Sequence, residues 1–81
     1  SLYEKRAPES LWRESLWLKL RELDGVRWSK FVELHQIDPR RICSDTIDSL
    51  TARGLVESGP DFLRLSNRGV LFADEVGAAF L

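Results

Sequence analysis

The segment Ser44-Asp-Thr-Ile-Asp-Ser-Leu-Thr-Ala-Arg-Gly-Leu-Val-Glu57 decides the fold of this chain. Ser44 is a good N-cap residue, because its hydroxyl oxygen can accept a hydrogen bond from a backbone N–H group of the first helical turn. Ile47 and Leu50 follow at helical spacing, and Gly54 can adopt the left-handed conformation that ends a helix. The segment therefore predicts a helix with both ends marked, from Ser44 to Gly54.

Two short strands and a second capped helix are predicted directly after this helix. Leu55–Ser58 and Phe62–Leu65 are typical of strands, and Ser58-Gly-Pro-Asp61 between them favours a turn. Ser66 can then cap another helix. A helix, a glycine, a hairpin and a capped helix in this order are typical of a winged helix.

Two further helices are predicted before this unit, over Pro8–Leu23 and Arg27–His35, and the helix capped by Ser66 is predicted over Asn67–Phe80. Pro8 is tolerated in the first turn of a helix, and Asp24-Gly25 should end the first helix. Pro39 ends the second, because the residue before a proline is pushed out of the helical region. One face of the last helix should close the core with Phe72, Ala73, Val76 and Phe80.

The predicted fold class is therefore α+β and mostly helical: a small winged-helix-like domain of about four helices and a two-stranded wing. Residues 1–7 are expected to be a flexible lead-in, and residues 8–81 a single domain.

The composition limits the classes of function. Twelve basic and thirteen acidic residues give a net charge of −1, so no global field favours nucleic acid or an anionic membrane. No apolar run approaches the ~20 residues of a membrane span. A single cysteine excludes an internal disulfide, and we expect a cytoplasmic setting. The chain has no methionine, which leads us to expect a piece of a longer protein.

The first helix has two apolar faces. At about 100° per residue, a core stripe is formed by Trp12, Leu16, Leu20 and Leu23. The opposite side carries a second, half-apolar strip made of Leu11, Glu14, Leu18 and Arg21. A surface helix normally has one apolar stripe. Either the C-terminal helix folds back over this strip, or a partner outside this chain covers it.

The faces of the third helix bear on nucleic-acid binding. Its core side should hold Ile42, Cys43, Ile47 and Leu50, and its outward side Ser44, Asp45, Asp48 and Ala52. Two carboxylates on a DNA-reading face would repel phosphates. Arginines that could instead hold phosphate lie nearby, at Arg40, Arg41, Arg53, Arg64 and Arg68. Nucleic acid is therefore not the expected partner, but a DNA-binding regulator domain stays open as an alternative.

The sequence shows no chemistry of its own. It has no Gly-rich phosphate loop and no Ser-His-Asp or Cys-His set. His35 and Cys43 are the only soft metal ligands, too few for a closed zinc site. His35 is interpreted as a capping or core-edge residue and Cys43 as a small buried apolar residue. We expect neither a catalytic nor a metal-binding residue in this chain.

Three segments carry a resemblance to a known family: Glu14–Val26, Leu50–Val56 and Leu63–Gly69. Within them, the elements that match are Glu14, Leu20-Arg21, Gly25, Gly54-Leu55 and Leu65-Ser66-x-x-Gly69. In this order and spacing the chain resembles the C-terminal domain of the oxygen-independent coproporphyrinogen III oxidase family, which includes the oxidase-like haem chaperones. The resemblance covers about Glu14 to Phe80. Lys19 and Glu22 depart from it, because the family usually has a small and an apolar residue there.

The resemblance implies an accessory domain without catalytic function in this chain. In that family a small winged-helix-like domain packs beside a radical S-adenosylmethionine barrel, and the barrel holds the four-iron cluster. The cluster and S-adenosylmethionine are thus expected for the parent protein, whose N-terminal catalytic barrel is the expected partner. Our hypothesis is that Leu11, Glu14, Leu18 and Arg21 dock on that barrel. A protein-interaction winged helix unrelated to haem is a further alternative.

Overall fold

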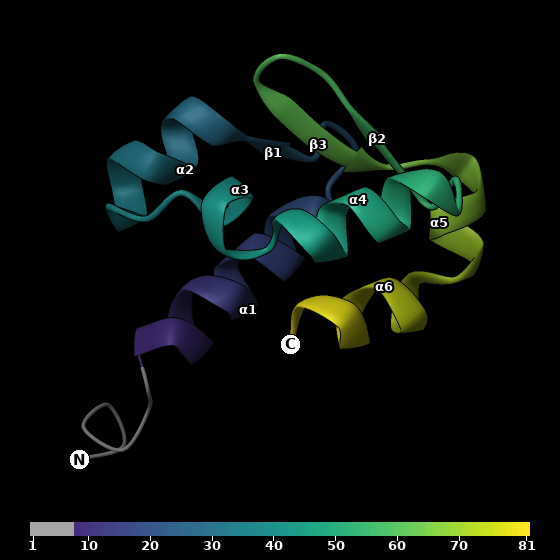
Figure 1. Cartoon of the computed structure of the whole chain (residues 1–81), viewed down its shortest axis with the longest axis horizontal. Coiled ribbons are helices and arrows are strands. Elements are labelled where there is room, and N and C mark those ends of the chain that lie inside the picture. Colours follow the sequence, from purple (N-terminus) through teal and green to yellow (C-terminus); the bar gives the residue numbers. More distant parts are fainter. Residues whose placement is uncertain (1–7) are drawn as a thin grey trace.

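The computed structural model describes residues 8–81, which form six helices and three strands (Figure 1). The predicted lead-in, residues 1–7, lies outside the described residues. The elements are α1 (Pro8–Leu20), β1 (Val26–Arg27), α2 (Trp28–His35), α3 (Pro39–Ile42), α4 (Ser44–Ala52), β2 (Val56–Ser58), β3 (Phe62–Leu65), α5 (Asn67–Leu71) and α6 (Ala73–Phe80). The predicted α+β, mostly helical class is confirmed. No helix within this range has the length and apolar character needed to cross a bilayer.

The sheet has three antiparallel strands in the order β1-β3-β2. The predicted hairpin is present as β2 and β3, with Val56 opposite Leu65. The strand missed from the sequence is β1, where Val26 pairs with Leu63. A two-residue strand leaves no alternating pattern to detect, because its pairing depends on a partner more than thirty residues further along the chain. The wing thus extends into a small sheet, in which β1 contacts both α1 and α2.

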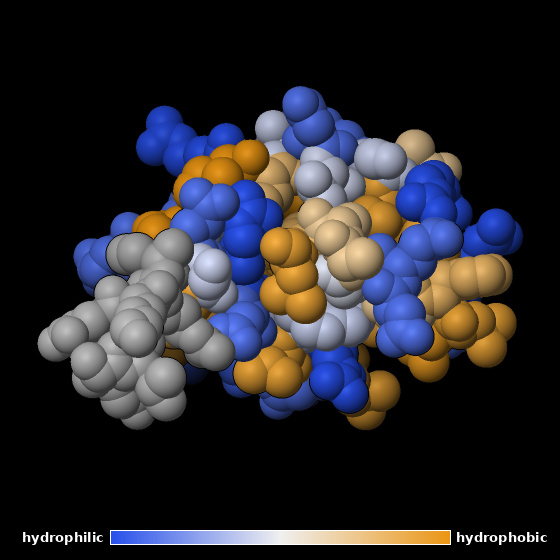
Figure 2. Space-filling view, turned by 90° about the horizontal axis from the view of Figure 1, so that it is seen from below, coloured by the Kyte–Doolittle hydropathy of each residue, from blue (hydrophilic) through white to orange (hydrophobic). Residues whose placement is uncertain are grey.

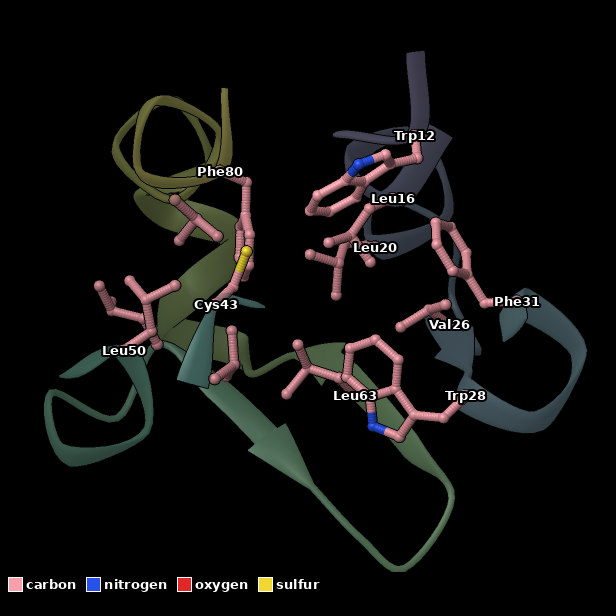
Figure 3. Close-up of a cluster of buried hydrophobic side chains, with 13 residues drawn as sticks. Trp12, Leu16, Leu20, Val26, Trp28, Phe31, Cys43, Leu50, Leu63 and Phe80 are labelled. Atoms are coloured by element: carbon pink, nitrogen blue, oxygen red, sulfur yellow. The ribbon is translucent and has the colours of Figure 1, made fainter. Parts of the chain in front are cut away.

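The core lies between α1, the sheet and the C-terminal helix (Figure 3). Three of the four predicted stripe residues of α1, Trp12, Leu16 and Leu20, are buried there. They meet Leu63 of β3 and Phe80 of α6, both fully buried. The remaining buried apolar residues are Val26, Trp28, Phe31, Cys43, Leu50, Leu55, Val56 and Val76.

The fourth predicted stripe residue, Leu23, is 94% exposed. Its placement was wrong because α1 ends at Leu20, three residues earlier than predicted. The chain then turns, and the Gly25 N–H donates to the carbonyl oxygen of Glu22 at 3.0 Å. Helical spacing no longer applies beyond Leu20, so Leu23 points away from the core.

The region before α4 differs from the prediction in two ways. Ile42 was expected on the core face but is 53% exposed, because it belongs to a separate short helix, α3. Asp38 caps α3 by accepting a hydrogen bond from the Arg40 N–H at 3.0 Å. Ser44 is the first residue of α4 rather than its cap, and the N-cap position belongs to Cys43. The burial predicted for Cys43 is confirmed.

The predicted last helix is broken at Phe72. Its N-terminal cap is confirmed, since the Ser66 hydroxyl oxygen accepts a hydrogen bond from the Gly69 N–H at 2.9 Å. Phe72 has non-helical dihedral angles (φ −116°, ψ 35°) and is exposed, contrary to its predicted place on the core face. The change of direction at Phe72 brings α6 back over the core, where Val76 and Phe80 are buried. Ala73 is half-buried.

The helix end predicted at Gly54 is confirmed. Gly54 has φ +74° and follows α4 directly after Arg53. The Leu55 N–H donates to the carbonyl oxygen of Leu50 at 2.9 Å, and the Ser66 hydroxyl donates to the carbonyl oxygen of Gly54 at 2.6 Å. The start of the last helical region thus holds the end of α4, and this contact fixes the direction in which the hairpin leaves the helix.

Gly25 and Gly54 make a matched test of this fold. Both have a positive φ, +72° and +74°. A Cβ at Gly25 would lie 2.2 Å from the carbonyl oxygen of Leu63. A Cβ at Gly54 would have no atom of the described residues within 4 Å, apart from those of its two chain neighbours. Gly54→Ala should lower the free energy of unfolding by roughly 1–2 kcal/mol through backbone strain alone. Gly25→Ala should lower the free energy of unfolding by roughly 1–3 kcal/mol more than Gly54→Ala does, because the added Cβ also pushes β3 away.

Urea unfolding followed by circular dichroism measures both variants against the unsubstituted chain. Equal losses of stability in the two variants would contradict the close approach of Gly25 to β3.

Candidate functional site

The arginines proposed for phosphate binding are largely engaged by neighbouring groups. Three pair with carboxylates, in the ion pairs Arg40–Asp38 (2.8 Å), Arg64–Glu57 (2.9 Å) and Arg53–Glu75. The Arg68 guanidinium lies over the Phe72 ring at 5.7 Å. Arg41 is exposed on α3. Three of these five side chains are therefore held by carboxylates, which reduces the positive charge that they offer to phosphate.

The outward face of α4 is acidic, as predicted. Asp45 and Asp48 are both exposed, and so are Ser44 and Ala52 on the same side. A helix that reads base edges offers hydrogen-bond donors and positive charge to DNA, which carries one negative charge per ~1.7 Å of axis. This face offers carboxylates instead and would repel the phosphates.

The two soft ligands of the chain lie apart in the fold. Cys43 is a free, buried cysteine within the core. His35 ends α2 with its ring stacked on Phe31, 4.3 Å between ring centroids. Within residues 8–81 no three His, Cys, Asp or Glu side chains come close enough to share a metal ion. An iron–sulfur cluster needs several cysteine thiolates, and one buried cysteine does not fit it.

We call the half-apolar side of α1, with Leu11, Glu14, Leu18 and Arg21, the α1 strip, and both of its leucines are exposed. Leu18 is 59% exposed near the C-terminal end of α1, and Leu11 is 40% exposed near its start. Glu14 is half-buried. Arg21 directly follows the last residue of α1, and its guanidinium lies 5.9 Å from the centroid of the Trp17 ring. The strip therefore combines exposed leucines with charged side chains.

The C-terminal helix packs on a different side of α1. Gly77 of α6 lies against Trp17, where an added Cβ would be 2.8 Å from the indole ring. The Arg13 guanidinium Nη1 donates to the carbonyl oxygen of Phe80 at 2.9 Å. The first explanation for the second apolar face, coverage by the C-terminal helix, is therefore wrong for Leu18, which stays exposed.

A groove of about 500 Å³ lies between α1 and α2 and includes Leu18. Its opposite wall carries Leu34, which is 75% exposed, and its floor includes the buried side chains of Val26 and Phe31. We call it the α1–α2 groove. The sequence did not predict this groove, because Leu18 and Leu34 belong to two different predicted helices, Pro8–Leu23 and Arg27–His35. The approach of α2 to α1 depends on the turn at Gly25.

The rim of the α1–α2 groove is mainly basic. Lys19, Arg27 and Lys30 line it, against one acidic residue, Glu22. Lys19 and Glu22 form an ion pair of 3.2 Å, so the two residues that depart from the family pattern contact each other. Arg27 and Lys30 are exposed at the other side of the groove. The groove is thus locally positive in a chain whose net charge is −1.

A second exposed apolar patch lies at the α5 end of the molecule (Figure 2). It comprises Val70, Leu71 and Phe72, all exposed. Asp74 and Glu75 border it at the start of α6. This patch is remote in sequence from the α1 strip and has charged neighbours of both signs, because the Arg68 guanidinium lies over the Phe72 ring and Glu75 pairs with Arg53.

The position of α2 beside the groove is fixed by Asp61. Its carboxylate accepts hydrogen bonds from the Ser29 hydroxyl at 2.7 Å and from the Ser29 N–H at 3.0 Å. These hydrogen bonds, with a smaller effect of nearby Arg27 and Arg40, lower the pKa of Asp61 below its ordinary value. The hydrogen bond from Arg40 lowers the pKa of Asp38 in the same way. Asp61 therefore ties the first turn of α2 to the start of β3.

Comparison with known proteins shows the family to which the chain belongs. A model of the HemN C-terminal domain matches residues 7–72 of the chain. The match spans the α1 strip, the α1–α2 groove and the hairpin. No curated protein and no solved structure gives a significant match.

Ser29→Ala tests the anchor of α2. Removing the hydroxyl should raise the pKa of Asp61 toward its ordinary value of 3.8, while the pKa of Asp38, held by Arg40, stays unchanged. Because folding lowers the pKa of Asp61, its carboxylate stabilises the fold above the ordinary pKa, and this contribution is lost as pH falls through the lowered value. On acidification, the free energy of unfolding of the variant should therefore fall less than that of the unsubstituted chain.

Carboxyl chemical shifts followed by NMR between pH 2 and 7 give both pKa values. A shift of Asp38 as large as that of Asp61 would refute the separate assignment of the two carboxylates.

Proposed function

The chain belongs to the HemN C-terminal domain family, and on this premise we propose that it is a non-catalytic accessory domain of a coproporphyrinogen III oxidase-like radical S-adenosylmethionine protein. Its role is to pack against the catalytic barrel of that parent. The four-iron cluster and S-adenosylmethionine belong to the barrel in this proposal. The parent is either an oxidase or a haem chaperone.

The exposure of Leu18 is the observation that carries this proposal. The opposite side of α1 is filled by Trp12, Leu16 and Leu20, so α1 already has a complete core face. A second leucine-bearing face serves no packing purpose inside the described domain. Apolar surface rimmed by polar residues marks interaction sites. A neighbouring domain is the partner that the family name supports.

The charged members of the α1 strip suit a docking interface. Glu14 and Arg21 lie on either side of Leu18 along the chain, four residues before it and three residues after it. In interfaces of this kind apolar side chains provide burial and peripheral charges fix the orientation. Glu14 and Arg21 also match the family motif, which supports a shared role in docking.

The alternative of nucleic-acid binding has less support. The exposed Asp45 and Asp48 on α4 oppose phosphate contact, and three of the five arginines are paired with carboxylates. We also propose a cytoplasmic location, which the free thiol of Cys43 supports.

Leu18→Glu tests the docking role, with Leu23→Glu as its matched control. Both leucines are exposed. The free energy of unfolding of each variant of the 81-residue chain should therefore lie within about 0.5 kcal/mol of that of the unsubstituted chain. In the full-length parent, Leu18→Glu should weaken the contact between the domains at least tenfold, roughly the effect of losing an interface anchor. Leu23→Glu should leave it unchanged.

Thermal unfolding of the 81-residue variants measures the first effect, and the rate of limited proteolysis between the two domains measures the second. An unfolded Leu18→Glu chain would mean that Leu18 serves this domain's own core. A normally folded variant with unchanged interdomain proteolysis would exclude docking through Leu18.

A further inference from the structure

The α1–α2 groove extends the α1 strip onto a second helix. Leu18 belongs to both, and Leu34 of α2 faces the groove from its other wall. Between them lie Val26 and Phe31, whose side chains are buried among core residues and give the groove a firm floor. Two exposed leucines above an apolar floor form a site into which side chains of another segment can insert.

The charges of the rim select the kind of segment that fits. Lys19 is already paired with Glu22 at 3.2 Å, which leaves Arg27 and Lys30 as the cations of the opposite rim. Asp61, the acidic residue near Arg27, is engaged by hydrogen bonds from Ser29. A basic segment would meet repulsion on this rim, whereas an acidic one would find complementary charge.

We infer that the α1–α2 groove binds an acidic amphipathic segment of the catalytic part of the parent. Apolar side chains of this segment pack between Leu18 and Leu34, and its carboxylates meet Arg27 and Lys30. The inference rests on the proposed function, because it assigns the segment to the same partner. It adds α2 to the docking surface and states the chemistry of what docks there.

The groove is more specific for this occupant than the other apolar patch. Val70, Leu71 and Phe72 at the α5 end are exposed as well, but Asp74 and Glu75 border them. Arg68 over the Phe72 ring and Arg53 paired with Glu75 offset these two carboxylates, so an acidic segment meets no net positive charge there, whereas Arg27 and Lys30 attract it at the groove. The two patches therefore provide a test and its control on the same molecule.

The test uses the 81-residue chain and two synthetic peptides of about 14 residues, roughly four helical turns. Both carry leucines on one helical face, flanked by glutamates in one peptide and by lysines in the other. The glutamate peptide should bind at least about fivefold more tightly than the lysine peptide, and its affinity should fall as salt rises. Fluorescence anisotropy of the labelled peptides measures the affinities.

Two pairs of variants locate the binding. Leu34→Glu should lower the affinity for the glutamate peptide by roughly tenfold or more. Leu71→Glu, at a similarly exposed leucine of the α5 end, should leave that affinity unchanged. Lys30→Glu should reverse the preference between the two peptides, whereas Arg41→Glu, an exposed arginine outside the groove, should leave it unchanged. Circular dichroism checks that all four variants fold.

Several results would overturn the inference. They are equal affinity for the two peptides, no binding of the glutamate peptide at about 1 mM, or NMR shift changes at α5 rather than at Leu18 and Leu34. The proposed function is judged separately in the full-length parent. If Leu18→Glu disrupts docking there while Leu34→Glu and Lys30→Glu do not, the domain docks through the α1 strip alone and only the groove inference fails.

Discussion

The packing of α1 onto the sheet and α6 is the contact on which the rest of the structure depends. Trp12, Leu16 and Leu20 are buried against Leu63 and Phe80, and this contact fixes the rotation of α1 about its axis. Once that rotation is set, helical geometry alone turns Leu18 toward solvent. The surface that we assign to docking is therefore a direct consequence of how the core is filled.

Much of the fold could be predicted because its signals are local. The end of α4 at Gly54, the cap at Ser66 and the burial of Cys43 depend on a few neighbouring residues. The wrong placements, Leu23, Ile42 and Phe72, all lie where a helix stops. For Leu23 and Phe72 a periodic pattern was extended past the last helical residue, and for Ile42 the pattern of α4 was extended backwards into the separate helix α3.

The candidate site shows the same division between local and distant information. The second face of α1 follows from spacing within one helix, so Leu11 and Leu18 could be found in the sequence. The α1–α2 groove could not, because it needs the turn at Gly25 and the hydrogen bonds between Ser29 and Asp61, which are 32 residues apart. The Arg53–Glu75 pair, 22 residues apart, likewise neutralises an arginine that appeared available in the sequence.

The lengths of the outer strands also bear on how the isolated domain behaves in concentrated solution. In the order β1-β3-β2 the two edges belong to strands of two and three residues. An edge this short presents few unpaired backbone groups, so it is a poor template for a strand from another molecule. The domain can thus keep an antiparallel sheet at its surface with little tendency to self-associate through edge-to-edge pairing.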